Sequence, residues 1–102
     1  MIIDLCEICG ASEPSHDIEG VSIPYIRKGV VQQVAGTWPL CDVCVKALHD
    51  RNFSALSGWV MSNRVAQESG KEVREREMDQ ARAKFEAILD SVQSGSRLTR
   101  RP

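Results

Sequence analysis

The chain has 102 residues, of which 42% are hydrophobic and 26% are charged, and its formal net charge is −1 at pH 7. This composition is typical of one soluble domain, and it argues against a disordered chain, a collagen-like chain and bulk electrostatic binding of nucleic acid. Five aromatic residues make a thin core, and small domains with thin cores usually need a disulfide or a metal. The four cysteines are the obvious candidates.

We expect a cytoplasmic protein with no membrane partner. No apolar segment approaches the roughly 18 residues of a membrane span. Asp4 also interrupts the apolar N-terminal residues where a signal peptide needs a continuous run. Thiols are kept reduced in the cytoplasm, which favours cysteines as metal ligands over disulfides.

Residues 21–35 predict a small β-hairpin. Apolar residues alternate over 21–26, residues 27–29 supply a turn, and residues 30–35 form a second run rich in valine. Pro24 suits an edge strand because it has no N–H to donate. A hairpin alone is only marginally stable, so we expect it to pack against another element.

The chain after the hairpin predicts helices. The first is expected to be capped by Asp42 and to run to His49. Asn52 or Ser54 is expected to cap a second helix that reaches about Glu68.

A further helix over residues 71–93 has the clearest periodicity. Gly95 predicts its end, and we expect residues 96–102 to form a disordered basic tail. We expect the apolar stripe of this helix to pack on the first half of the chain, with a homodimer or partner contact as the alternative. The stripe consists of Met78, Ala81, Phe85, Ile88 and Val92.

Two Cys-x2-Cys pairs form the strongest motif. Each such turn can place two sulfurs at two corners of a tetrahedron, so two turns complete the four-thiolate shell that zinc prefers. Gly10 permits the tight backbone after the first pair, and the second pair opens a helix whose N-terminus favours thiolates. We predict a structural Zn²⁺ in a treble-clef-like or zinc-ribbon-like finger, and the ligands are Cys6, Cys9, Cys41 and Cys44.

Other uses of the four cysteines remain open at this point: two local disulfides, four unrelated buried thiols, or iron. The first pair with Gly10, and residues 38–40 before the second pair, look like rubredoxin, but Val45 stands where that family has its second glycine. A catalytic zinc keeps an open position, and His16 and His49 are expected to be surface residues. Without a nucleophile–base pair or a phosphate-binding loop, we expect no enzyme activity.

The hairpin and the second cysteine pair together resemble the zinc-binding domain of the MqsA/YgiT-type antitoxins. The likeness rests on residues 23–29, the second strand and Cys41-x2-Cys44. It implies structural zinc ligands and binding of a toxin. It ends at about Lys46, so the helix-turn-helix and DNA binding of that family are not carried over.

A second resemblance is to the zinc finger of the DksA/TraR regulators of RNA polymerase. It rests on Cys6-x2-Cys9-Gly10, on Pro24 and Arg27, and on the second cysteine pair. In that family the cysteine pairs stand closer together and the long helix precedes the finger. Both resemblances imply a small bacterial or phage zinc-finger regulator.

We therefore predict an α+β protein with a zinc finger and hairpin over residues 1–50 and two or three helices, including an extension over 51–95. The expected function is to bind and modulate a larger protein, such as a host factor, a toxin or a component of the transcription machinery. The chain is expected to act as a monomer or a homodimer. Candidate partner contacts are Trp38, Tyr25, Phe85 and Ile88.

The alternative function is nucleic-acid binding through the basic second half of the chain. Residues 51–102 carry ten basic and seven acidic side chains, whereas residues 1–50 carry three basic and seven acidic. The candidate phosphate contacts are Arg97, Arg100 and Arg101.

Overall fold

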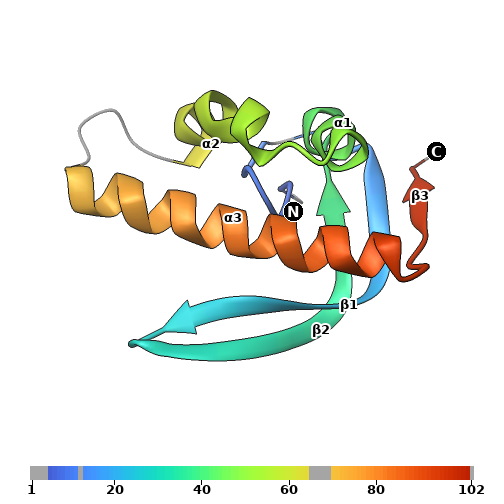
Figure 1. The fold of residues 1–102 in the computed structure, drawn as a ribbon, viewed down its shortest axis with the longest axis horizontal. Helices are drawn as coiled ribbons and strands as arrows, with labels where there is room; N and C mark the ends of the chain where they lie inside the picture. Colours follow the sequence, from blue (N-terminus) through green and yellow to red (C-terminus); the bar gives the residue numbers. More distant parts are fainter. Residues whose placement is uncertain (1–4, 12, 65–69, 102) are drawn as a thin grey trace.

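A three-stranded antiparallel sheet and three α-helices make up the part of the chain that the computed structural model describes, residues 5–11, 13–64 and 70–101 (Figure 1). The predicted α+β class is confirmed. In chain order the elements are β1 (His16–Arg27), β2 (Val30–Leu40), α1 (Asp42–Asp50), the short 3-10 helix η1 (Phe53–Leu56), α2 (Ser57–Arg64), α3 (Lys71–Gln93) and β3 (Leu98–Arg100). None of the described helices is both long and apolar enough to cross a membrane.

The β1–β2 hairpin is about twice as long as predicted. Its turn is Lys28-Gly29, where both residues have positive φ, as two-residue hairpin turns require. Nearer its base, β1 carries one extra residue between Ile18 and Val21, with Gly20 at φ 70°. This bulge brings Ile18 and Val21 to the same face of β1, so the alternation that predicted the strand begins only after it.

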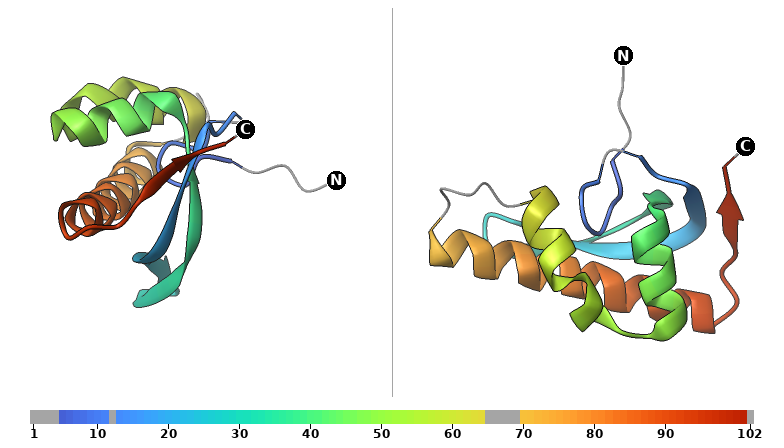
Figure 2. Two further views of the ribbon diagram at one scale, coloured as in Figure 1. Left: turned by 90° about the vertical axis from the view of Figure 1, so that its right-hand side faces the viewer. Right: turned by 90° about the horizontal axis from the view of Figure 1, so that it is seen from above.

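Helix α3 covers the hairpin along β1. Figure 2 shows the helices gathered on one side of the sheet, and α3 packs on β1. Ala81, Phe85 and Ile88 of α3 are all buried in the core. The predicted packing of α3 within the chain is confirmed. Phe85 and Ile88 are therefore wrong as partner contacts, since at 2% and 0% exposure they belong to the core.

The helix boundaries follow the prediction with two differences. The range of α3 matches, but the N-cap of α1 is Cys41, with extended φ and ψ, and the predicted cap Asp42 lies in the first turn. An acidic side chain there still complements the helix dipole. The second predicted helix divides into η1 and α2, and residues 65–69 lie outside the described chain.

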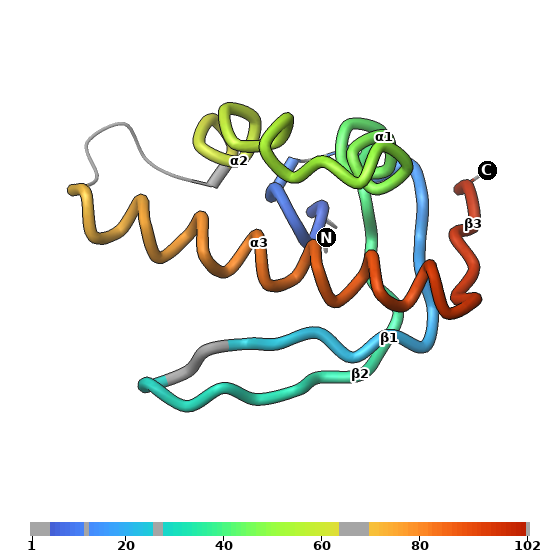
Figure 3. Tube along the Cα trace, in the orientation of Figure 1, coloured from blue at the N-terminus to red at the C-terminus, as the bar shows by residue number. Residues whose placement is uncertain are grey.

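The prediction of a disordered tail is wrong for residues 98–101. Strand β3 pairs antiparallel with His16–Ile18 of β1, at the base of the hairpin (Figure 3). Arg101 then donates two side-chain hydrogen bonds to Asp17, at 2.9 Å and 2.8 Å, and its backbone N–H bonds the carbonyl of Ser15. A three-residue strand has no pattern of its own, because β1 supplies its partner groups.

The short β3 also explains Pro24. Strand β1 lies between β2 and β3, but β3 reaches only as far as Ile18. Beyond that point the second edge of β1 is not occupied by any described strand. Pro24 therefore lies at a locally free edge, where its missing N–H costs no ladder hydrogen bond.

Candidate metal centre

The four cysteine sulfurs converge on one point. All four thiols are buried, and their Sγ atoms lie within 4.8 Å of one another. Across the two pairs, Cys6 Sγ lies 3.6 Å from Cys44 Sγ, and Cys9 Sγ lies 3.4 Å from Cys41 Sγ. Sulfurs around a tetrahedral zinc ion stand about 3.8 Å apart, given a Zn–S bond of about 2.3 Å. The prediction that the two pairs form one cluster is confirmed.

The sulfurs are free thiols, which excludes the two local disulfides left open by the sequence. A disulfide needs an S–S distance of about 2.05 Å, and the two distances between the pairs, 3.6 Å and 3.4 Å, are also far longer. Such a set of buried thiols could hold a metal ion.

A tight turn presents the first pair. The N–H of Gly10 bonds the carbonyl of Cys6, and the N–H of Cys6 bonds the carbonyl of Ala11. Gly10 has φ 80°, a conformation that glycine adopts without strain, so its predicted role in the turn is confirmed. The N–H of Ala11 points at Cys9 Sγ, 3.4 Å away, and stabilises negative charge on that sulfur.

The second pair stands at the junction of β2 and α1. Strand β2 ends at Leu40, Cys41 caps the helix, and Cys44 lies in its first turn, where the N–H of Val45 bonds the carbonyl of Cys41. The positive end of the helix dipole therefore faces the sulfurs and favours their thiolate form. Glu7 lies in the turn between Cys6 and Cys9. Its N–H bonds the carbonyl of Pro39, near the second cysteine pair, and this hydrogen bond connects the two pairs.

The sequence analysis missed one neighbour of the cluster. Trp59, on α2, donates its indole N–H to Cys9 Sγ at 3.1 Å. The two residues are 50 positions apart, and no local pattern in the sequence relates them. Trp59 remains 38% exposed, and beside it a recess of about 240 Å³ opens between α2, Cys41 and Asp42.

Without a cation between them, the four thiols cannot all lose their protons at once. Hydrogen bonds from Cys44, Cys6 and Cys9 hold the pKa of Cys41 below its usual range. The hydrogen bond with Cys41 raises the pKa of Cys44 and of Cys9. Negative charge on one sulfur thus opposes charge on the next, and a cation at the centre is what would let four thiolates coexist.

Neither histidine belongs to the cluster in the described chain. His16 Nδ1 lies 2.8 Å from Ser15 Oγ and 3.7 Å from Asp42 Oδ1. His49 is exposed in the last turn of α1. The donor set is therefore four sulfurs, which leaves no protein-held open position of the kind that a catalytic zinc uses.

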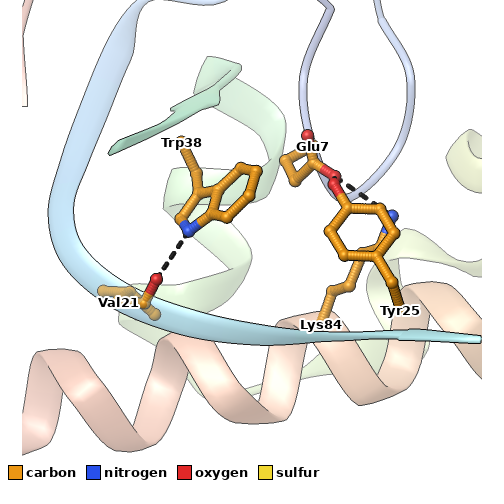
Figure 4. Close-up of polar contacts among 5 residues, drawn as sticks. All are labelled: Glu7, Val21, Tyr25, Trp38 and Lys84. Carbon is orange, nitrogen blue, oxygen red and sulfur yellow. Dashed lines mark hydrogen bonds and ion pairs between the residues drawn. The ribbon is translucent and has the colours of Figure 1, made fainter. Parts of the chain in front are cut away.

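A largely buried ion pair connects the turn at Cys6 and Cys9 to α3 (Figure 4). Lys84 Nζ lies 3.1 Å from Glu7 Oε1 and 4.4 Å from the centre of the Tyr25 ring, and only 3% of Lys84 is exposed. Tyr25 donates its hydroxyl hydrogen bond to the same carboxylate oxygen. Sequence reasoning missed this group because its members come from three separate elements.

The candidate partner and nucleic-acid contacts are not members of the cysteine cluster. Tyr25 and Trp38 are half-buried neighbours with ring centres 5.9 Å apart, and Trp38 donates its N–H to the carbonyl of Val21 at 2.7 Å (Figure 4). Arg97 and Arg100 are exposed. Arg101 instead bonds Asp17, as described above.

The chain was also compared with known proteins. No protein-family model, curated protein or solved structure matches it. The resemblances to the antitoxin and polymerase-regulator zinc domains therefore stay predictions. What is known of the site comes from its own residues.

Proposed function

We propose that this is a small zinc-finger-like regulatory protein, in which one structural zinc ion holds the fold and the β1–β2 hairpin binds a larger protein. The observation that carries the proposal is the convergence of four buried Sγ atoms within 4.8 Å. A closed shell of four thiolates is typical of structural zinc sites. The same donor set suits iron, so the identity of the metal is the first thing to test.

Zinc would act here by joining two distant parts of the chain. It would link the turn at Cys6 and Cys9 to the junction of β2 and α1, across 31 residues that include the whole hairpin. Since a preformed site rarely exists in an unfolded chain, the free energy of metal binding is also free energy of folding. The thin core makes such a contribution necessary.

The partner surface proposed is the partly exposed area around Tyr25 and Trp38, on the face of the hairpin that α3 partly covers. These two rings, with Gln32 and Val34, line an open recess of about 410 Å³. Aromatic residues that remain partly exposed are common anchors of protein interfaces. The proposal favours a protein partner over nucleic acid because Arg101, one of three candidate phosphate contacts, is already paired with Asp17.

The metal is tested by measuring zinc and iron per chain in protein purified without added metal, and by the absorption of the cobalt-substituted form. We expect one zinc per chain and the intense sulfur-to-cobalt bands of a four-thiolate site. Cys41→Ser should lose the metal and much of the helical circular dichroism. Val43→Ser is the matched control, because Val43 lies in the same turn with its side chain exposed. A chain that is fully folded without metal would contradict the proposal.

The partner is tested by retention of proteins from nuclease-treated lysate of the source organism. We expect one stoichiometric protein to be retained by the wild type and lost with Val34→Asp, but kept with Val73→Asp. Both valines are 38% exposed, and Val73 lies on α3 away from the hairpin recess. Retention that disappears with nuclease would instead support the nucleic-acid alternative.

A further inference from the structure

Strand β2 is a long edge strand. The strand order is β2-β1-β3, so β1 occupies one edge of β2 and no described strand occupies the other. The carbonyls of Pro39 and Leu40 accept the N–H groups of Glu7 and Ser15, and before them the strand presents a row of N–H and C=O groups on that side. Such a row is a template for pairing with another strand.

The free edge of β2 lacks the features that normally prevent pairing. No charged residue occurs between Gly29 and Leu40. Val30 and Val31 are each 59% exposed, and Val34 is 38% exposed. Natural edge strands are usually protected by lysines, inward-pointing charges, prolines or bulges. The only proline of β2 is Pro39, near the end of the strand at the base of the hairpin. The distal half of β2 therefore has neither a charge nor a proline to prevent pairing.

We propose that two copies of this chain pair through β2, antiparallel and around a two-fold axis at Gln32, to form one six-stranded sheet. Residues that lie opposite each other in such a pair must point to the same face of the sheet. Side chains alternate between the two faces along β2, so opposite residues are both even-numbered or both odd-numbered. With Gln32 on the axis, Val30 faces the second copy's Val34, and each glutamine faces its symmetry mate. Valine thus meets valine at both ends of the contact, and the glutamine amides can exchange hydrogen bonds at its centre.

The charge of β2 favours a second copy as the occupant. A symmetric pair places residues of one strand opposite residues of the same strand, so several like charges on that strand would repel one another. Residues 29–40 carry no charge and therefore carry no such penalty. The dimer pairs the backbone edge of β2, which the proposed function does not use, so this inference goes beyond it, although the side chains of Gln32 and Val34 also line the proposed partner recess.

The expected dimer is weak. Pairing of the distal half of β2 with its mate is expected to bury less than the roughly 800 Å² per partner of a standard stable interface. We therefore expect a monomer at low concentration and a dimer at high concentration. The mass by sedimentation equilibrium should rise from 11.3 kDa towards twice that value.

Two double variants test the edge and its register. Val30→Lys with Val34→Lys places lysine against lysine at both ends of the contact and should abolish the dimer. Val30→Glu with Val34→Lys changes the same two exposed positions but places glutamate against lysine, and it should restore the dimer. Zinc content and circular dichroism of each variant show that the monomer is folded.

Each result decides the proposal. A wild type that stays monomeric up to its solubility limit overturns it and leaves the edge to a strand of another protein. A dimer that survives the two lysines overturns the assignment to β2. If both double variants stay monomeric and folded, the Gln32-centred register is wrong. A metal-free but folded dimer would count against the proposed zinc site and not against this pairing.

Discussion

The indole N–H of Trp59 donates a hydrogen bond to Cys9 Sγ across 50 residues of sequence, with 3.1 Å between the two atoms. Cys9 also receives the N–H of Ala11, so this sulfur has two donors. Both donors favour the thiolate, and only one of them comes from the turn that contains the cysteine. The contact therefore links α2 to the cysteine cluster.

Replacing Trp59 with phenylalanine should weaken metal binding. The variant keeps an aromatic ring but loses the N–H donor, and groups that support metal ligands typically contribute 10-fold or more to affinity. We expect Trp59→Phe to raise the Kd for zinc by about 10-fold, measured by competition with a chromophoric chelator. Trp38→Phe is the control, because Trp38 bonds the carbonyl of Val21 instead of a sulfur. Equal affinities of the two variants would contradict the coupling.

The ion pair between Glu7 and Lys84 should contribute to stability as a coupled unit. Lys84→Met keeps the apolar stem but leaves the largely buried Glu7 carboxylate without its cation, and should cost about 2 kcal/mol. Adding Glu7→Gln to that variant should recover part of the loss, with a coupling free energy of about 1 kcal/mol or more. Urea unfolding of the zinc-loaded proteins measures both. Strictly additive losses would show that the two groups do not interact.

The Asp17–Arg101 pair should make β3 docking depend on pH. Hydrogen bonds from Arg101 lower the pKa of Asp17 in the folded chain. The stabilisation is therefore complete above the unfolded pKa of about 3.9 and is lost as the pH falls through the folded pKa. Near neutral pH we expect Asp17→Asn to cost about 1 kcal/mol, or roughly 4–8 °C in Tm.

The measurement is the difference in Tm between wild type and Asp17→Asn at each pH, because acid release of metal affects both proteins alike. The difference should shrink towards zero in acid. Arg100→Gln serves as the control, since the Arg100 side chain is exposed on β3. A difference that stays constant from neutral pH into acid would mean that the ion pair does not stabilise the fold.

A substitution in the hairpin turn should stabilise the protein. Lys28 has φ 52°, a region that costs free energy for lysine and little for asparagine. Lys28→Asn would create the Asn-Gly pair that such turns prefer, and we expect a gain of about 0.5 kcal/mol. Lys46→Asn, on the exposed side of α1, should instead lose stability because asparagine is a poorer helix former. Thermal unfolding distinguishes the two changes.

Local sequence patterns predicted the parts of the structure that local physics determines. The spacing of the cysteine pairs predicted the cluster, because each pair shapes its own turn. The periodicity of residues 71–93 predicted α3, and Gly29 indicated the hairpin turn. These features depend on neighbours no more than a few positions apart.

The remaining features depend on groups brought together only by the fold. Strand β3 forms because β1 offers a free edge, and residues 98–100 show no strand pattern by themselves. Lys84 lies on the buried face of α3 with Ala81 and Ile88, and this position accepts a lysine because Glu7 and Tyr25 supply its partners. The bond from Trp59 to Cys9 is similarly non-local.

The cysteine cluster lies at the base of the hairpin, where Cys41 follows the last residue of β2, and the Lys28-Gly29 turn lies at the other end of the strands. Opening of the strand ends beyond Tyr25 therefore need not disturb the sulfurs, the Tyr25–Glu7 hydrogen bond or the burial of Ile18 and Val21. Two levels of amide hydrogen exchange follow: fast exchange near the turn through local opening, and slow exchange near the base that requires global unfolding. The strands of the hairpin can thus open near the turn while the hydrogen bonds at the base remain intact.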